Sequence, residues 1–123
     1  MPEPDSSIDP IDSPGEEPLE DALATRSAFA RALSRGGFAD VLVLGRDRAA
    51  EVFHPRRLEI CDHLREHDPA SVRGLATALD RDPGLISRDL GRLAELGVVE
   101  LEPDGRALVP RLAARHVVVE PVV

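Results

Sequence analysis

The sequence predicts a mainly helical α+β fold with a small antiparallel sheet. The first observation is an apolar helical pattern at residues 71–79, which a tight turn separates from a second one at 83–96 that Gly97 ends. The second is a pair of β-rich segments on either side of a Pro-Asp-Gly-Arg turn at residues 103–106. Two helices across a turn followed by a hairpin is the element order of a winged helix-turn-helix, so we expect a DNA-binding protein.

Three regions are predicted along the chain. Residues 1–18 contain five prolines, many acids and few large apolar groups, so we expect a disordered acidic tail. Residues 19–37 are predicted to form an N-terminal helix that ends at two glycines. Residues 38–123 are predicted to form a winged helix-turn-helix domain with a flanking strand.

The flanking elements come first in this domain. A β-rich segment at residues 38–44 predicts a short strand, and residues 46–53 predict one or two helical turns. Pro55 opens a further helix, which Asp68-Pro69 interrupts. We expect the strand at 40–44 to pair with the C-terminal strand at 116–122.

The helix-turn-helix has capping residues at both starts. Ser71 is predicted to cap its first helix, and Asp82 with Pro83 to begin the second. The wing then follows, with strands predicted at 98–102 and 107–112.

The second helix of the motif separates an apolar face from a polar one. Ile86, Leu90 and Leu93 share the apolar face, and at about 100° per residue the opposite face carries Arg88 and Arg92. We expect these two arginines to contact DNA; the alternative is that they only solubilise an exposed helix. Glu95 also lies on the outward face, and we expect its repulsion of phosphate to limit how deeply the helix enters the DNA groove. Asp89 lies nearer the apolar face and is expected to pair with an arginine.

The remaining candidates surround this helix. Arg106 at the wing turn is expected to enter the minor groove, although an ordinary turn arginine is an equal alternative. Arg73 and Arg81 flank the turn of the motif and are expected to contact phosphates. The predicted DNA-binding residues are Arg73, Arg81, Gly84, Ser87, Arg88, Arg92 and Arg106.

The net charge of −8 does not exclude a nucleic-acid partner, because the acids are unevenly distributed. Residues 1–21 hold eight acids and no base, whereas the rest of the chain balances fifteen acids with fifteen arginines. The acidic tail is interpreted as solvated padding, with autoinhibition by DNA mimicry and partner binding as alternatives. The absence of lysine, tyrosine and tryptophan indicates a GC-rich genome combined with a salt-rich cytoplasm.

The positions of the cysteine and the histidines do not predict a metal site, and the sequence does not predict an enzyme. Cys61 is the only cysteine, which excludes an intramolecular disulfide and fits a reducing cytoplasm. His63 and His67 share a helix face, but Cys61 projects toward the apolar side, so these three make a poor ligand set. No catalytic constellation occurs in a suitable frame. We therefore expect a cytoplasmic non-enzyme without metal or cofactor.

The chain resembles archaeal and bacterial winged helix-turn-helix regulators of the MarR/ArsR-like type, and most closely a group of small DNA-binding proteins prominent in haloarchaea. The matching segments are PRRLEI, SVRGLATAL, RDPGLISRDLGRLAELGVVEL and HVVVEPV, within residues 38–122. The resemblance implies a homodimeric transcription regulator of double-stranded DNA, with the helix at 83–96 in the major groove and a wing at 98–112. The alternative to a DNA-binding regulator is an antitoxin-like or adaptor module that keeps the winged-helix fold and binds a toxin or other protein.

Two positions depart from that pattern. His54 stands where a threonine or serine cap is usual, and Gly74 replaces the usual glutamate of a capping box. Both departures are expected to weaken the local helices without changing the predicted DNA binding.

Overall fold

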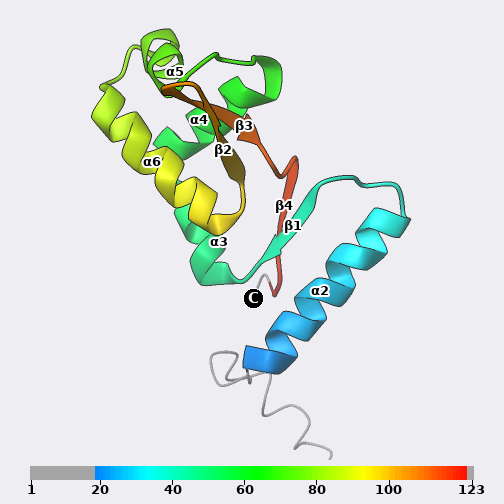
Figure 1. Cartoon of the computed structure of the whole chain (residues 1–123). Coiled ribbons are helices and arrows are strands. Elements are labelled where there is room, and N and C mark those ends of the chain that lie inside the picture. The colour runs from blue at the N-terminus through cyan, green and yellow to red at the C-terminus, as the bar shows by residue number, and fades with distance from the viewer. Residues whose placement is uncertain (1–18, 122–123) are drawn as a thin grey trace, which may run out of the picture.

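A computed structural model describes residues 19–121, which form five helices and four strands (Figure 1). The expected tail at 1–18 lies outside the described residues. In chain order the elements are α2 (Leu19–Arg35), β1 (Val41–Leu44), α3 (Arg46–Val52), α4 (Pro55–Glu66), α5 (Val72–Leu79), α6 (Pro83–Leu96), β2 (Val99–Asp104), β3 (Ala107–Leu112) and β4 (His116–Val119). None of these helices is long and apolar enough to cross a membrane.

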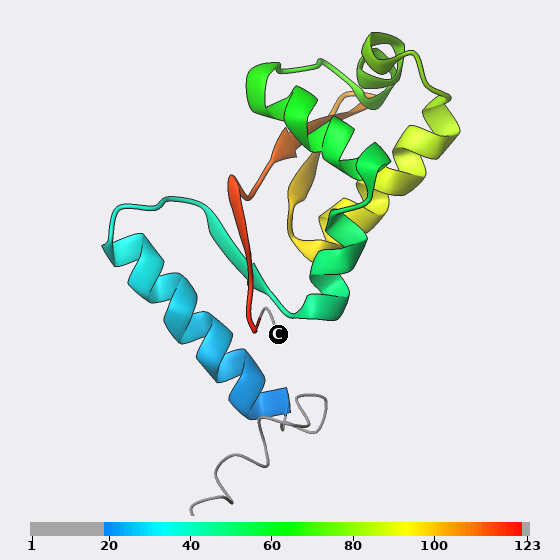
Figure 2. The ribbon, with the colours of Figure 1, turned by 180° about the vertical axis from the view of Figure 1, so that it is seen from behind.

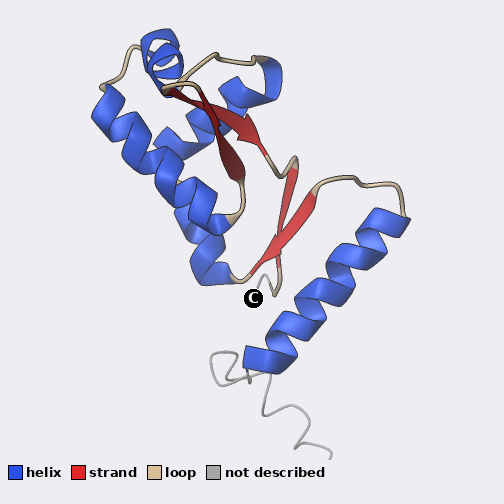
Figure 3. Cartoon of the chain, viewed as in Figure 1, coloured by secondary structure: helices blue, strands red, loops and turns tan. Residues whose placement is uncertain are grey.

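The core lies where α3 to α6 meet the antiparallel hairpin of β2 and β3, as Figure 3 shows in blue and red. Apolar side chains one helical turn apart on α4, α5 and α6 meet there and exclude water. The fully buried residues of this cluster include Ile60, Leu75, Ile86, Leu90, Leu93 and Val98. This packing is the predicted winged helix-turn-helix, mainly helical with a small antiparallel sheet.

The expected pairing of the flanking strand with the C-terminal strand is confirmed, in a parallel orientation. Val41 lies opposite His116 and Leu44 opposite Val119. The strands are parallel because they start together: the backbone N–H of Arg115 donates to the carbonyl oxygen of Asp40 at 2.9 Å. This pair is a second two-stranded sheet, separate from the wing hairpin.

Helix α2 lies against β1 and apart from α3 to α6, as both the front and the rear view show (Figure 1, Figure 2). The Arg26 side chain anchors it, since Nε donates to the carbonyl oxygen of Glu120 at 2.9 Å. Much of its apolar surface stays in contact with solvent: Leu19 is 68% exposed and Leu23 is 52% exposed.

The start of α4 has a side-chain cap although His54 departs from the usual threonine or serine. His54 does cap this helix, because its Nδ1 accepts a hydrogen bond from the backbone N–H of Arg56 at 3.2 Å. An imidazole nitrogen can therefore replace the hydroxyl that a threonine or serine would supply. At α5 the Ser71 cap is present despite Gly74, since Ser71 Oγ accepts from the Gly74 N–H at 3.0 Å.

Candidate nucleic-acid interface

The turn between α5 and α6 fixes the direction in which α6 leaves the core. Asp80 adopts a left-handed conformation with φ 54° and ends α5. Asp82 then caps α6, with Oδ2 accepting from the Leu85 N–H at 3.1 Å, and Pro83 occupies the first turn. At the other end Gly97, with φ 90°, turns the chain into the wing. The predicted caps of the motif are confirmed.

An open groove lies between α5, α6 and the wing. It has a volume of about 400 Å³ and combines residues from all three elements: Ser71, Val72, Arg73, Ser87, Arg106, Ala107 and Leu108. Three of the predicted site residues therefore line one surface: Arg73, Ser87 and Arg106. Hydroxyl and guanidinium groups around such a groove can donate hydrogen bonds to phosphate oxygens or base edges.

Three arginines on this side carry positive charge that no acid neutralises within residues 19–121. The side chains of Arg73, Arg88 and Arg106 are exposed, and none of them forms an ion pair with a described residue. Gly84 is also exposed, at the first turn of α6. This arrangement leaves the start of α6 accessible to a polyanion.

Arg92 is placed differently, because it is already paired within the protein. Its Nε and Nη2 each donate to one carboxylate oxygen of Glu51 on α3 at 2.6 Å, and its Nη1 donates to Glu95 at 2.9 Å. The two parallel bonds lower the pKa of Glu51 and raise that of Arg92, chiefly through the shared hydrogen bonds. The guanidinium links α6 to α3, and Glu95 partners it directly.

Arg81 is also part of an internal network. Its side chain is only 12% exposed and donates to Asp89 Oδ2 at 3.0 Å and to the carbonyl oxygen of Arg56 at 3.0 Å. Asp89 accepts a second bond from Arg57 Nε at 3.1 Å. The predicted role of Asp89 as an arginine partner is confirmed, and its carboxylate ties α6 to α4 and to the turn of the motif.

Sequence reasoning missed Glu51. It lies 41 residues before Arg92, and no local pattern connects the two positions. Asp89 was identifiable because its place on the helix, between the apolar and polar faces, is a local property.

His63 on α4 and His67, which follows the end of that helix, stack on each other with ring centroids 4.4 Å apart. Cys61 is buried, as predicted. Within the described residues no three histidine, cysteine or acidic side chains cluster closely enough to hold a metal ion.

The chain matches a known protein family. The model of the HVO_A0114 family matches residues 52–119, more than half of the chain, from the end of α3 to the end of β4. A search among curated proteins found no match.

Three of the solved structures that are similar to this chain are bacterial proteins. The homodimeric winged helix-turn-helix DNA-binding domain of Mb0332 from Mycobacterium bovis, a fragment described as a possible ArsR-family transcriptional regulator, is 30% identical with a TM-score of 0.49. That match covers 55% of this chain and 66% of the fragment, just under two thirds.

HlyU from Vibrio cholerae is 22% identical with a TM-score of 0.50, over 55% of this chain and 72% of HlyU. A predicted DNA-binding transcriptional regulator from E. coli is 18% identical with a TM-score of 0.48, over 77% of this chain and 83% of that one. At 22% identity, the likeness to HlyU concerns the fold alone.

Proposed function

We propose that this chain, which belongs to the HVO_A0114 family, is a DNA-binding regulator of transcription. The observation that carries the proposal is the groove in which Arg73, Ser87 and Arg106 from three elements come together. Unpaired arginines around a helix-turn-helix and a wing are the electrostatic signature of a nucleic-acid interface.

In the proposed complex α6 lies in the major groove of double-stranded DNA. Its first turns enter most deeply, so Arg88 is the residue placed to reach a guanine edge. Gly84 and Ser87 permit a close approach of the backbone to the sugar-phosphate wall. Arg73 contacts phosphate, and Arg106 at the wing tip enters the minor groove.

Arg81 and Arg92 take a positioning role in this proposal. Both are engaged by acids of the same chain: freeing Arg92 for DNA would leave Glu51 without its ion-pair partner, and freeing Arg81 would leave Asp89 with Arg57 alone. They set the angle of α6 against α3 and α4. The base-reading surface is then centred on Arg88.

The regulator is proposed to act as a homodimer. Two recognition helices about one DNA turn apart read a palindromic site, which is how most helix-turn-helix proteins gain affinity. Support comes from apolar residues that the described fold leaves exposed: Leu19, Leu23, Phe29 and Phe38. A second copy would remove these side chains from water.

The test is a salt-dependent titration of the full chain against a DNA fragment from the promoter of its own operon. Each phosphate contact contributes about one unit to the slope of log K against log salt. Arg73→Ala should therefore flatten the slope by about one unit, and Arg106→Ala should weaken binding through the loss of its minor-groove contact. Arg88→Ala should weaken binding by roughly tenfold or more and relax sequence preference.

Arg31→Ala on α2 is the matched control, because Arg31 is equally exposed and lies outside the proposed interface. DNA affinity equal in all four variants would refute the interface. Retention of a protein from the native host together with no DNA binding would instead favour the antitoxin-like or adaptor alternative.

A further inference from the structure

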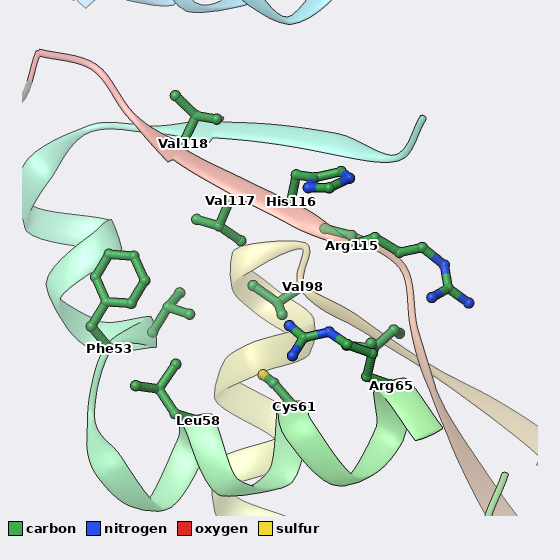
Figure 4. A pocket seen from close by; sticks show the side chains of 12 residues that line it. Phe53, Leu58, Cys61, Arg65, Val98, Arg115, His116, Val117 and Val118 are labelled. Carbon is green, nitrogen blue, oxygen red and sulfur yellow. The ribbon is translucent and has the colours of Figure 1, made fainter. Parts of the chain in front are cut away.

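A second groove lies between α4 and β4 and shares no residue with the proposed DNA interface (Figure 4). Its volume is about 360 Å³, within the usual range of roughly 300–1,000 Å³ for small-molecule sites. Leu58 and Cys61 from α4 and Val117 from β4 point into the same space, with Val98 between them. The wall is formed by side chains far apart in the sequence.

The chemistry of the wall is apolar and cationic. Nine of the lining residues are apolar: Val52, Phe53, Leu58, Cys61, Val98, Leu112, Ala114, Val117 and Val118. The other three are Arg65, Arg115 and His116, and no aspartate or glutamate lines the groove. Such a wall favours a ligand with an apolar body and a negative charge.

The interior of the groove is poorly hydrated at Cys61. Burial, followed by the nearby Asp62 carboxylate, raises the pKa of the Cys61 thiol to about 11. The thiol therefore stays neutral at physiological pH and acts as an apolar surface. Hydrogen bonds from an arginine to an anion are stronger beside such a surface than in water.

One acid outside the lining competes for Arg65. Asp62 accepts a hydrogen bond from Arg65 Nη1 at 3.1 Å, but the two side chains are 70% and 51% exposed. An ion pair so exposed to water contributes little, so an incoming carboxylate can replace it.

We propose that this groove binds a small organic anion with a short alkyl or aryl body. Its carboxylate is held by Arg65, whose guanidinium reaches toward Cys61 and Val98, and Arg115 adds positive charge at the rim (Figure 4). Its apolar body lies against Leu58, Cys61 and Val98.

Val98 places this site next to the DNA-facing elements. It follows Gly97 at the end of α6, and its carbonyl oxygen accepts hydrogen bonds from the N–H groups of Ala113 and Ala114 at 2.8 and 3.1 Å. A bound anion thus touches the residue that joins α6 to the segment between β3 and β4. The binding itself does not depend on the proposed DNA function.

The test uses three probes with the same alkyl chain and different heads: octanoate, octanamide and octylammonium. Calorimetric titration of the full chain should show saturable binding of octanoate at one site per chain. Octanamide should bind about tenfold more weakly because it lacks the charge, and octylammonium should not bind.

Substitutions locate the site. Arg65→Met should weaken octanoate binding about tenfold and Arg115→Met by a smaller factor, while Arg65→Lys should keep much of the affinity. Arg48→Met is the matched control, since Arg48 is exposed on α3 and does not line the groove. Circular dichroism checks that each variant is folded.

Three outcomes would overturn the proposal. They are no saturable octanoate binding up to millimolar concentration, equal affinity for octanoate and octylammonium, and unchanged octanoate affinity in both arginine variants. None of them depends on DNA, so the proposed regulator function is tested separately.

Discussion

The side chain of Cys61 is buried in the core, where water is excluded. The thiol is 6% exposed, and its pKa of about 11 reflects burial first and the neighbouring Asp62 second. In an unfolded chain the same thiol ionises near pH 8.5. The unfolded state therefore loses its proton first as pH rises.

This difference predicts a loss of stability at alkaline pH. Stability should be unaffected by the thiol below about pH 8.5 and should fall by roughly 2–3 kcal/mol as pH rises toward 11. Urea unfolding between pH 8 and 11 measures it, with Cys61→Ala as the control that removes the slope. The chain has no lysine or tyrosine, so no other side chain titrates in that window. An identical slope in Cys61→Ala would contradict the prediction.

Among the helices, the orientation of α6 depends on acids from the same chain. Glu51 on α3 holds Arg92 through two bonds, and Asp89 on α6 holds Arg57 and Arg81. Helix packing alone leaves a helix free to rotate by some degrees, whereas a planar guanidinium on a carboxylate fixes one geometry. We expect this pairing to matter more for DNA recognition than for folding.

A double-mutant cycle tests the link between α3 and α6. Glu51→Gln and Arg92→Met should each lower the urea midpoint at pH 7, and the double variant should lose less than both losses added together. Because the pKa of Glu51 is lowered in the folded state, its contribution is present above about pH 4.3 and disappears as pH falls below it. The coupling measured by the cycle should therefore weaken as pH falls below about 4.3. Fully additive losses at pH 7 would show that the pair is not coupled.

Local features of the elements were predictable from the sequence, and long-range ones were not. Ser71, Asp82 and Gly97 mark helix ends through their own backbone chemistry, so the bounds of the motif could be predicted closely. Arg92 looked like a DNA contact because its helix face is outward, and only the fold brings Glu51 to it. The parallel register of β1 and β4 likewise depends on where the chain returns to Asp40.

At the scale of the whole molecule, α2 is the least integrated part of the described fold. It contacts β1, and its apolar residues Leu19, Leu23 and Phe29 remain between 39% and 68% exposed. Covering a leucine side chain completely stabilises an association by about 1.5–3 kcal/mol. A second copy of the chain packed on the apolar face of α2 would be stabilised by burying these side chains.

Leu23→Glu should therefore weaken self-association about tenfold or more, as the loss of that burial implies. Light scattering across a concentration series measures it. Ala24→Glu is the matched control, because it adds the same charge at an exposed position about 100° around the helix from Leu23. Equal masses for the parent chain and Leu23→Glu at every concentration would place the dimer contact elsewhere, or show that none forms.

The pairing of β1 with β4 also makes α2 depend on the far end of the fold. The helix-turn-helix and the wing consist of neighbouring segments, whereas Arg26 and the Glu120 carbonyl oxygen that it binds are 94 residues apart. A chain cut before β4 would therefore keep every segment of the helix-turn-helix and the wing, and would lose both the partner strand of β1 and the anchor of α2.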